Sequence, residues 1–221
     1  MEIKEKLMGL LSNPFEGLEN NNASEFQFQN KCKKIAEELL KNYCIHCGEK
    51  TYYLAEIEFY YRDKDIAKWD NEWNKVTYSN RNGFEAGSLF YHLSGVDICF
   101  DCTANRYGGI LIRSIVEKNN NDEIITIGPL TCVNKMLNDC KGDKMPFVDK
   151  TKLVRSIEIC STYRYLGKND FNKIGSSDNN KDENLMLAFF DKKLEEAKWN
   201  KARSSYYKER LLKHIDKNKL C

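Results

Sequence analysis

The chain has 221 residues, of which 41% are hydrophobic and 31% charged, and its formal net charge is +2. This length and even composition favour one domain with appendages. The small charge says little about a nucleic-acid partner, because binding depends on where positive charge clusters. No apolar run approaches the roughly 20 residues of a membrane span. The N-terminus MEIKEKLMGLL is too acidic and too short for a secretory signal. We therefore expect a cytoplasmic protein with no membrane partner.

The first elements are predicted to be helical. Residues 2–11 can form a short helix that ends before Asn13-Pro14, because the residue before proline is pushed out of the helical region. Residues 1–23 are thus an N-terminal helix and loop. From residue 24 or 25 to about 43, apolar residues recur at helical spacing, which predicts a second helix covering a sheet.

Strands are predicted in the middle of the chain. CIHCGEK at 44–50 indicates a turn, after which Tyr53, Ala55, Ile57 and Phe59 alternate with Leu54, Glu56, Glu58 and Tyr60 on the other face of a strand over 52–61. Residues 62–86, with Trp69 and Trp73, indicate a long surface loop. Segments 89–93 and 96–100 flank Ser94-Gly95 and predict a hairpin.

A fourth strand is predicted over 110–116, with Arg113 at its centre. A polar turn at 119–123, a helix ending near Asp139 and a strand over 154–159 follow. We therefore expect a mixed α+β fold, a single domain with a curved, mainly antiparallel sheet, a projecting hairpin and flanking helices.

The end of the chain is polar and basic. Residues 169–184 are poor in apolar groups and predict a mobile loop, and residues 185–221 predict a C-terminal helix packed on the same domain. Lys198, Lys201 and Arg203 in this helix are interleaved with aromatic residues, a mixture that can bind phosphates and stack on bases. The alternative is a solvated amphipathic face.

Three charged residues lie within segments that are otherwise built like buried strands: Glu58, Asp101 and Arg113. Each would cost several kcal/mol in a buried sheet unless it is paired or used. We interpret them as a candidate site.

An ordered set of motifs resembles the monofunctional alkyladenine (3-methyladenine) DNA glycosylase family. Members have a leucine-pair helix, an E-x-E-x-Y strand, a G-x-x-Y-V-Y hairpin, a strand ending in Asn, L-I-R-A-x-E-P and a G-P helix start. The corresponding segments here are IAEELLKN (35–42), EIEFY (56–60), GSLFYHLSG (87–95), VDICFD (96–101), ILIRSIVE (110–117) and GPL (128–130). The resemblance covers roughly residues 30–140 and implies a glycosylase-like catalytic domain over 24–168.

The resemblance implies a role for each matching residue. Glu58 takes the position of the general base that deprotonates the attacking water, and Arg113 that of the arginine that holds this water. Tyr60 and Tyr91 take the positions of the aromatic walls around the flipped base. Ordinary packing of the tyrosines and a buried Glu58–Arg113 ion pair are the structural alternatives.

The chain also departs from the family. Trp69 falls where members have a base-contacting histidine, and Ser94-Gly95 replaces the wedging tyrosine of the hairpin tip. Either His92, Trp69 or Trp73 wedges the duplex instead, or the substrate is easier to flip. The guanine-rejecting asparagine is Asp101 here, which as a carboxylate would favour an amine or hydroxyl on the base.

Cysteines raise the question of a metal. Nine cysteines in a chain without an export signal predict free thiols. Cys44-x-x-Cys47 and Cys99-x-x-Cys102 have the spacing of zinc ligands, but an extended strand would point Cys99 and Cys102 to opposite faces. We expect no metal, although the CIHCG knuckle alone could bind one.

The predicted function is a monofunctional DNA glycosylase that flips out a damaged or modified base and leaves an abasic site. The excised base would differ from that of the family. If it is a hypermodified phage base, such as a modified cytosine, the enzyme would act in defence against phages. If it is an alkylated purine, the enzyme would act in repair. Its partner would be DNA carrying such a base, with no cofactor and no obligate protein partner. The alternative is a catalytically inactive nucleic-acid-binding module with the same fold.

Overall fold

A computed structural model describes residues 7, 9–12, 14–15, 25–70, 77, 79–119, 122–140, 145–151, 155–162 and 188–194. Its helices are α2 (Glu25–Asn42), α3 (Pro129–Asp139) and the short 3-10 turns η1 (Ala67–Trp69) and η3 (Ser79–Arg81). Its strands are β1 (Tyr43–Cys47), β2 (Lys50–Asp63), β3 (Leu89–His92), β4 (Gly95–Phe100), β5 (Arg106–Asn119), β6 (Asp122–Ile127), β7 (Phe147–Lys150), β8 (Ile159–Thr162) and β9 (Ala188–Asp191). Within these ranges no helix has the length and apolar character needed to cross a bilayer.

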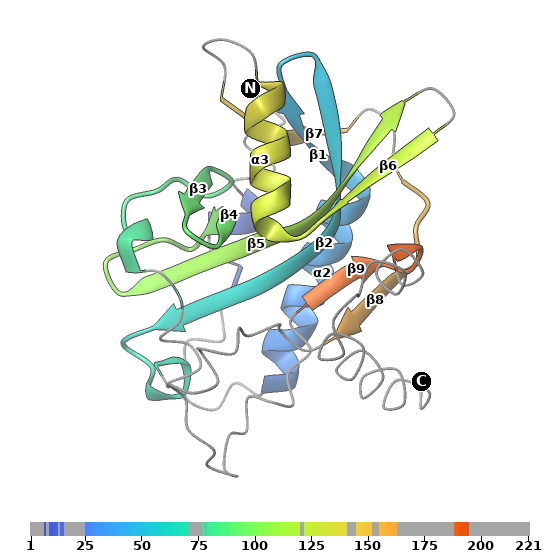
Figure 1. The fold of residues 1–221 in the computed structure, drawn as a ribbon. Coiled ribbons are helices and arrows are strands. Elements are labelled where there is room, and N and C mark those ends of the chain that lie inside the picture. The colour runs from blue at the N-terminus through green and yellow to red at the C-terminus, as the bar shows by residue number, and fades with distance from the viewer. Residues whose placement is uncertain are drawn as a thin grey trace, which may run out of the picture.

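The described strands form one curled sheet with the order β3-β4-β5-β2-β1-β7, to which β6 adds beside β5 and β9 beside β2. Every pairing is antiparallel. Figure 1 shows the long strands β2 and β5 side by side across the molecule, with the β3–β4 hairpin at one end and β6, β8 and β9 towards the other. The mixed α+β class and the curved antiparallel sheet predicted from the sequence are confirmed.

The main core lies between this sheet and both helices. α2 contributes Phe28, Cys32 and Leu39, and α3 contributes Cys132 and Met136, which are all buried. At the end of β2 the core becomes aromatic. Tyr61 packs against Phe28 and Phe100. Phe28 also stacks on Trp69, with ring centroids 4.6 Å apart. Aromatic pairs of this kind add stability beyond their buried area.

A β-bulge near Ala55 reverses which residues of β2 face the core. The register with β5 shifts on both sides of Glu56. The main core takes Tyr52 and Leu54 before the shift and Ile57, Phe59 and Tyr61 after it. Tyr53 and Ala55 pack instead into a smaller cluster with Val116 and Phe190. The predicted common face for Tyr53, Ala55, Ile57 and Phe59 is therefore wrong, because one extra residue flips the alternation.

Several predicted boundaries also change. Residues 43–47 are strand β1, and the turn is confined to Gly48 and Glu49. The hairpin turn is Leu93-Ser94 rather than Ser94-Gly95. The strand predicted at 154–159 begins only at Ile159, and residues 188–191, predicted as helix, form strand β9. The loop at 169–184 and most of the C-terminal helix lie outside the described residues.

Gly108 is required for close pairing of β4 and β5. A Cβ atom built there would lie 2.3 Å from the Phe100 carbonyl oxygen, which is backbone and cannot rotate away. We predict that Gly108→Ala lowers the free energy of unfolding by about 1–3 kcal/mol, as measured by urea denaturation. Gly9→Ala, where nothing lies within 4 Å, is the control and should leave stability unchanged or slightly increased; equal losses in both variants would contradict this packing.

Candidate functional site

Arg113 lies between two carboxylates of β2. Its Nη1 donates to Oε2 of Glu58 at 2.7 Å, and its Nε lies 3.8 Å from Oε1 of Glu56. The Ser114 hydroxyl donates to the other oxygen of Glu56 at 2.8 Å. Glu58 has no exposed surface, and the others are at most 7% exposed. This set, the Arg113 cluster, is a buried network of one cation and two anions.

The bulge and the start of α3 position the Arg113 cluster. Glu56 pairs with Ser114, and Glu58 with Leu111, so Arg113 lies on β5 between the partners of the two carboxylates. The Arg113 carbonyl accepts the N–H of Gly128 at 2.8 Å. Gly128 has a φ of 103°, which favours glycine, and Pro129 then starts α3. The Gly128-Pro129 motif thus fixes the start of α3 against β5 at Arg113.

A second buried ion pair lies on the same face of the sheet. Asp97 of β4 and Glu58 of β2 both pair with Leu111 of β5, one from each side, and cross-strand partners share a face. Asp97 accepts a hydrogen bond from Arg81, and each is 1% exposed. The ring of His92 lies 3.1 Å from Asp97 through Nε2.

Arg81 and His92 are held by specific contacts. A Cβ on Gly109 would meet the Arg81 guanidinium, so this glycine makes room for the charge. The Nδ1 of His92 accepts the Ser94 N–H at 3.2 Å. Burial, with a smaller effect of Arg81, lowers the pKa of His92 to about 4, so the ring is neutral at physiological pH.

Asp101 lies apart from Glu58, because it contacts the core face of β2 through Tyr61. It follows β4 in a left-handed conformation (φ 45°) and accepts a hydrogen bond from Tyr61, which belongs to the aromatic core face. Its second oxygen lies 3.2 Å from Arg106. Burial, followed by the charge of Asp101, raises the pKa of Tyr61, so this hydroxyl remains a proton donor.

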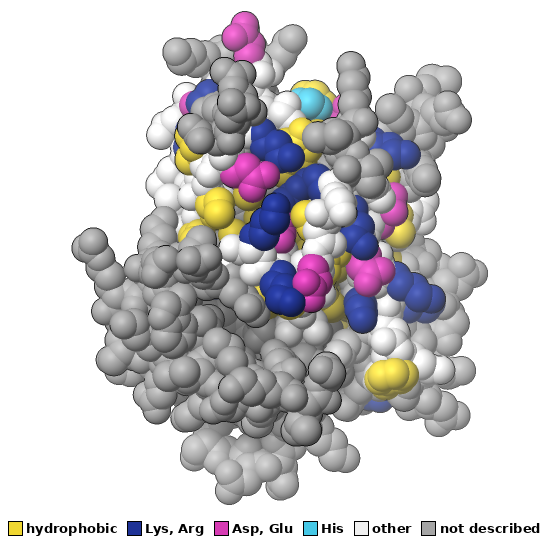
Figure 2. Space-filling model, turned by 90° about the vertical axis from the view of Figure 1, so that its right-hand side faces the viewer, with side chains coloured by type: hydrophobic (Ala, Val, Ile, Leu, Met, Phe, Trp, Pro, Cys, Tyr) yellow, Lys and Arg dark blue, Asp and Glu magenta, His cyan; other side chains and the backbone are white. Residues whose placement is uncertain are grey.

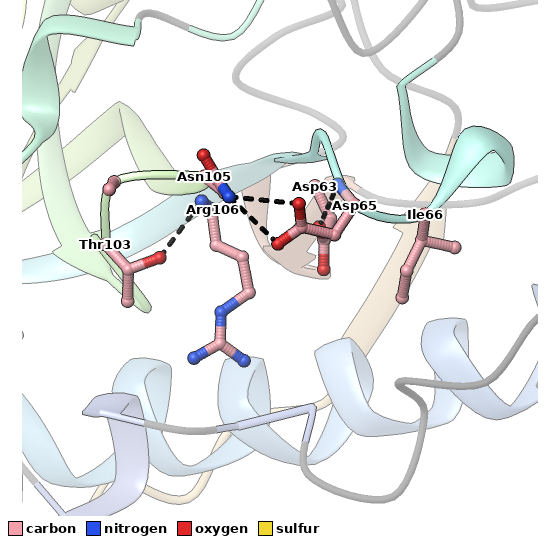
Figure 3. A pocket seen from close by; sticks show the side chains of 7 residues that line it. Asp63, Asp65, Ile66, Thr103, Asn105 and Arg106 are labelled. Atoms are coloured by element: carbon pink, nitrogen blue, oxygen red, sulfur yellow. Dashed lines mark hydrogen bonds between the residues drawn. The ribbon is translucent and has the colours of Figure 1, made fainter.

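A pocket of about 460 Å³ opens beside the Asp101–Arg106 pair. Asp63, Asp65, Asn105 and Arg106 line it (Figure 3), and the Asn105 amide donates to both oxygens of Asp65 at 3.0 and 3.1 Å. The Asp65 N–H in turn donates to Asp63. Asp63 pairs with Arg106 in the β2–β5 register, five residues along β2 from Glu58, which separates the pocket from the Arg113 cluster by roughly 16 Å of strand.

The predicted site residues therefore divide between the two faces. Glu58, Tyr60, Arg113 and His92 share the charged face, whereas Tyr91 and Trp69 pack against the main core. The Tyr91 hydroxyl is buried with no hydrogen-bond partner among the described residues, and burial raises its pKa. Trp69 is 3% exposed, so it fills the aromatic core rather than a solvent-facing wall.

The hairpin tip carries a residue that the sequence analysis missed. Leu93 is 92% exposed, whereas Gly95 packs against Pro129 of α3. Hydrophobic residues are unusual at a two-residue turn, so the leucine in the turn sequence was the feature that could have marked Leu93 as functional. Glu56, Arg81 and Asp97 were also missed, although the E-x-E motif and the alternation in VDICFD mark two of them.

The predicted DNA-contacting cations Lys198, Lys201 and Arg203 lie outside the described residues. On the face that Figure 2 shows, where β6, β8 and β9 lie, Lys and Arg side chains are interspersed with Asp and Glu. Two ion pairs lie at these strands: Lys118 of β5 with Glu123 of β6 at 3.6 Å, and Lys192, after β9, with Glu158, before β8, at 2.8 Å. This face therefore presents alternating charge rather than a continuous basic surface.

The thiols do not gather into a four-cysteine site. Cys47 forms a hydrogen-bonded pair with Cys140, and Cys99 with Cys102. Across the described part of the chain, no three His, Cys, Asp or Glu side chains are arranged to hold a metal ion. The extended strand on which the predicted opposite faces of Cys99 and Cys102 depended ends at Phe100, and Asp101 then turns the chain.

Comparisons with protein-family models, with curated proteins and with solved structures find no match for this chain.

Removal of the central cation tests the Arg113 cluster. Arg113→Leu leaves Glu56 and Glu58 buried without their guanidinium, and breaking a buried pair in this way costs about 3–5 kcal/mol. We predict a loss of this size in urea denaturation. Lys192→Met removes an exposed ion pair with Glu158 and should cost no more than about 1 kcal/mol. A loss for Arg113→Leu as small as that of the control would contradict the proposed importance of the cluster.

Proposed function

We propose that the protein is a monofunctional DNA glycosylase acting on a damaged or modified base. The observation that supports this best is the 2.7 Å contact between Arg113 and Glu58 in the centre of the sheet, with Tyr60 two residues further along the same face. A carboxylate to activate water, a cation beside it and an aromatic ring are the groups that hydrolysis of an N-glycosidic bond requires.

The proposed mechanism gives each group one step. The Glu58 carboxylate accepts a proton from water, and this water attacks the sugar carbon as the base leaves. Arg113 orients the carboxylate and balances the negative charge of Glu56 and Glu58. Because Glu58 has no exposed surface, the mechanism includes an opening of the charged face that admits the flipped nucleotide and the water.

The choice of base is proposed to depend on the charged face. Tyr60 and His92 lie on the same side as Glu58, whereas Asp101 is engaged with Tyr61 and Arg106. If Asp101 selects the base, whether a modified cytosine or an alkylated purine, the site must rearrange more than if Tyr60 and His92 select it. Because Nδ1 of His92 accepts the Ser94 N–H and Nε2 lies beside Asp97, contact of this ring with a base edge requires the ring to turn.

Leu93 is proposed to open the duplex. Apolar side chains inserted between base steps unstack them and kink the helix, and Leu93 at the hairpin tip is 92% exposed. It adjoins Ser94-Gly95, which replaces the wedging tyrosine of the family's hairpin tip.

The alternative is a nucleic-acid-binding module without catalysis. Complete burial of Glu58 favours this reading, and its pairing with Arg113 does not separate the two functions, because a structural ion pair has the same geometry. The two functions make different demands on Glu58, since only catalysis needs its carboxylate to accept a proton.

Glu58→Gln separates the two functions. In a glycosylase it should reduce abasic-site formation by about 10²–10⁴-fold, measured by alkali cleavage of DNA carrying modified bases, while DNA binding stays within a few fold. Glu158→Gln, whose side chain is 66% exposed, is the matched control and should retain full activity. Equal products from wild type and Glu58→Gln would favour the binding module.

Leu93→Ala tests the wedge. We predict that it weakens base extrusion, measured by the fluorescence of 2-aminopurine placed beside the target base, because Ala cannot fill the gap left in the stack. Leu137→Ala on α3, where the side chain is 39% exposed, should have no effect. An unchanged fluorescence signal with Leu93→Ala would exclude the hairpin tip as the wedge.

A further inference from the structure

Cys99 and Cys102 form a thiol pair that the proposed function does not use. Cys99 belongs to β4, where it pairs with Gly109, and its N–H donates to the Ser88 carbonyl at 2.8 Å. Cys102 follows the end of the strand. The left-handed backbone at Asp101 (φ 45°) turns the chain, so two residues that an extended strand would separate come together.

The two thiols differ in exposure and in hydrogen bonding. Cys99 is fully buried, whereas Cys102 is partly exposed. The Cys99 and Cys102 thiols influence each other's pKa, and the Cys102 thiol donates to the carbonyl oxygens of Phe100 at 3.3 Å and Gly108 at 3.5 Å. A partly exposed sulfur backed by a buried thiol is the arrangement of an attacking and a resolving cysteine.

The surroundings favour thiolate at one position only. The hydrogen bond from Cys99, with smaller effects of the Gly108 backbone and Arg81, outweighs burial and lowers the pKa of Cys102 to about 7. The hydrogen bond with Cys102, together with burial, raises the pKa of Cys99. Thiolate is the reactive form of cysteine, so Cys102 is the first sulfur to react.

We propose that Cys99 and Cys102 form a reversible dithiol–disulfide couple that exchanges with low-molecular-weight disulfides such as oxidised glutathione. The Cys102 thiolate attacks one sulfur of that disulfide, forms a mixed disulfide and releases one small thiolate. The Cys99 thiol then loses its proton and attacks the Cys102 sulfur, forming the Cys99–Cys102 bond and releasing the second small thiol. The protein loses two electrons and two protons, and the small disulfide is reduced.

A second thiol pair in the same chain provides an internal comparison. Cys47 and Cys140 are also hydrogen-bonded to each other, but burial, then the charge of Cys140, raises the pKa of Cys47. No guanidinium contributes to the pKa of Cys47, and Cys47 is fully buried, whereas Cys140 is partly exposed. This pair should react much more slowly than Cys99 and Cys102.

The couple can be tested on the full chain by peptide mass analysis. Trypsin cuts after Arg81 and Arg106, and the peptide 82–106 contains Cys99 and Cys102 and no other cysteine. After brief treatment with oxidised glutathione and alkylation of the remaining thiols, this peptide should carry no alkyl group and should lack two hydrogens. Dithiothreitol should restore two alkylated cysteines. Peptides with Cys47 or Cys140 should stay fully alkylated.

Two variants fix the order of attack. Cys99→Ser should trap glutathione on Cys102, because no thiol remains to displace it, whereas Cys102→Ser should leave Cys99 alkylatable and without glutathione. In wild type the oxidation rate should rise with pH through a midpoint near the pKa of Cys102. Full alkylation of peptide 82–106 in treated wild type, or no adduct in Cys99→Ser, would overturn the proposal.

Discussion

The interaction on which the rest of the structure depends is the contact of Arg113 with Glu56 and Glu58. Two carboxylates and one guanidinium are buried in the middle of the sheet, where each ion alone would cost several kcal/mol. Glu56 and Glu58 lie two residues apart on β2 and so share a face, and the bulge beside them turns that face away from the core. The bulge also reverses the alternation along β2, so the ion cluster and the arrangement of the core are set by one local irregularity.

The two faces of the sheet consequently have different characters. One face carries the core, which ends in the aromatic group around Tyr61, Phe28 and Trp69. The other carries the Arg113 cluster and the Arg81–Asp97 pair, which lie on either side of Leu111. Burying polar networks of this kind costs stability compared with apolar packing, which is why we interpret the charged face as functional. The Asp101–Arg106 pair belongs to neither the Arg113 cluster nor the Arg81–Asp97 pair, and it borders a separate pocket.

Much of this fold could be predicted from the sequence because strong local patterns specify it. The apolar spacing of α2, the alternation in β2, and Gly128-Pro129 at the start of α3 all depend on neighbouring residues only. The bulge could not be predicted, since it depends on how β2 matches β5. Nor could β9, because Ala188–Asp191 becomes a strand by pairing with β2 and β8. The grouping of Glu58 with Arg113 followed from motif order, whereas Asp101 was separated from them by the turn at the end of β4.

The functional interpretation depends on whether the charged face performs chemistry on a base. The most direct measurement is mass spectrometric detection of free base released when the wild-type protein is incubated with DNA carrying alkylated or hypermodified bases. The expected result is one specific free base, released in amounts equal to the abasic sites formed. Binding of the same DNA with no base released from any of these substrates would contradict the glycosylase assignment and leave the Arg113 cluster with a structural role.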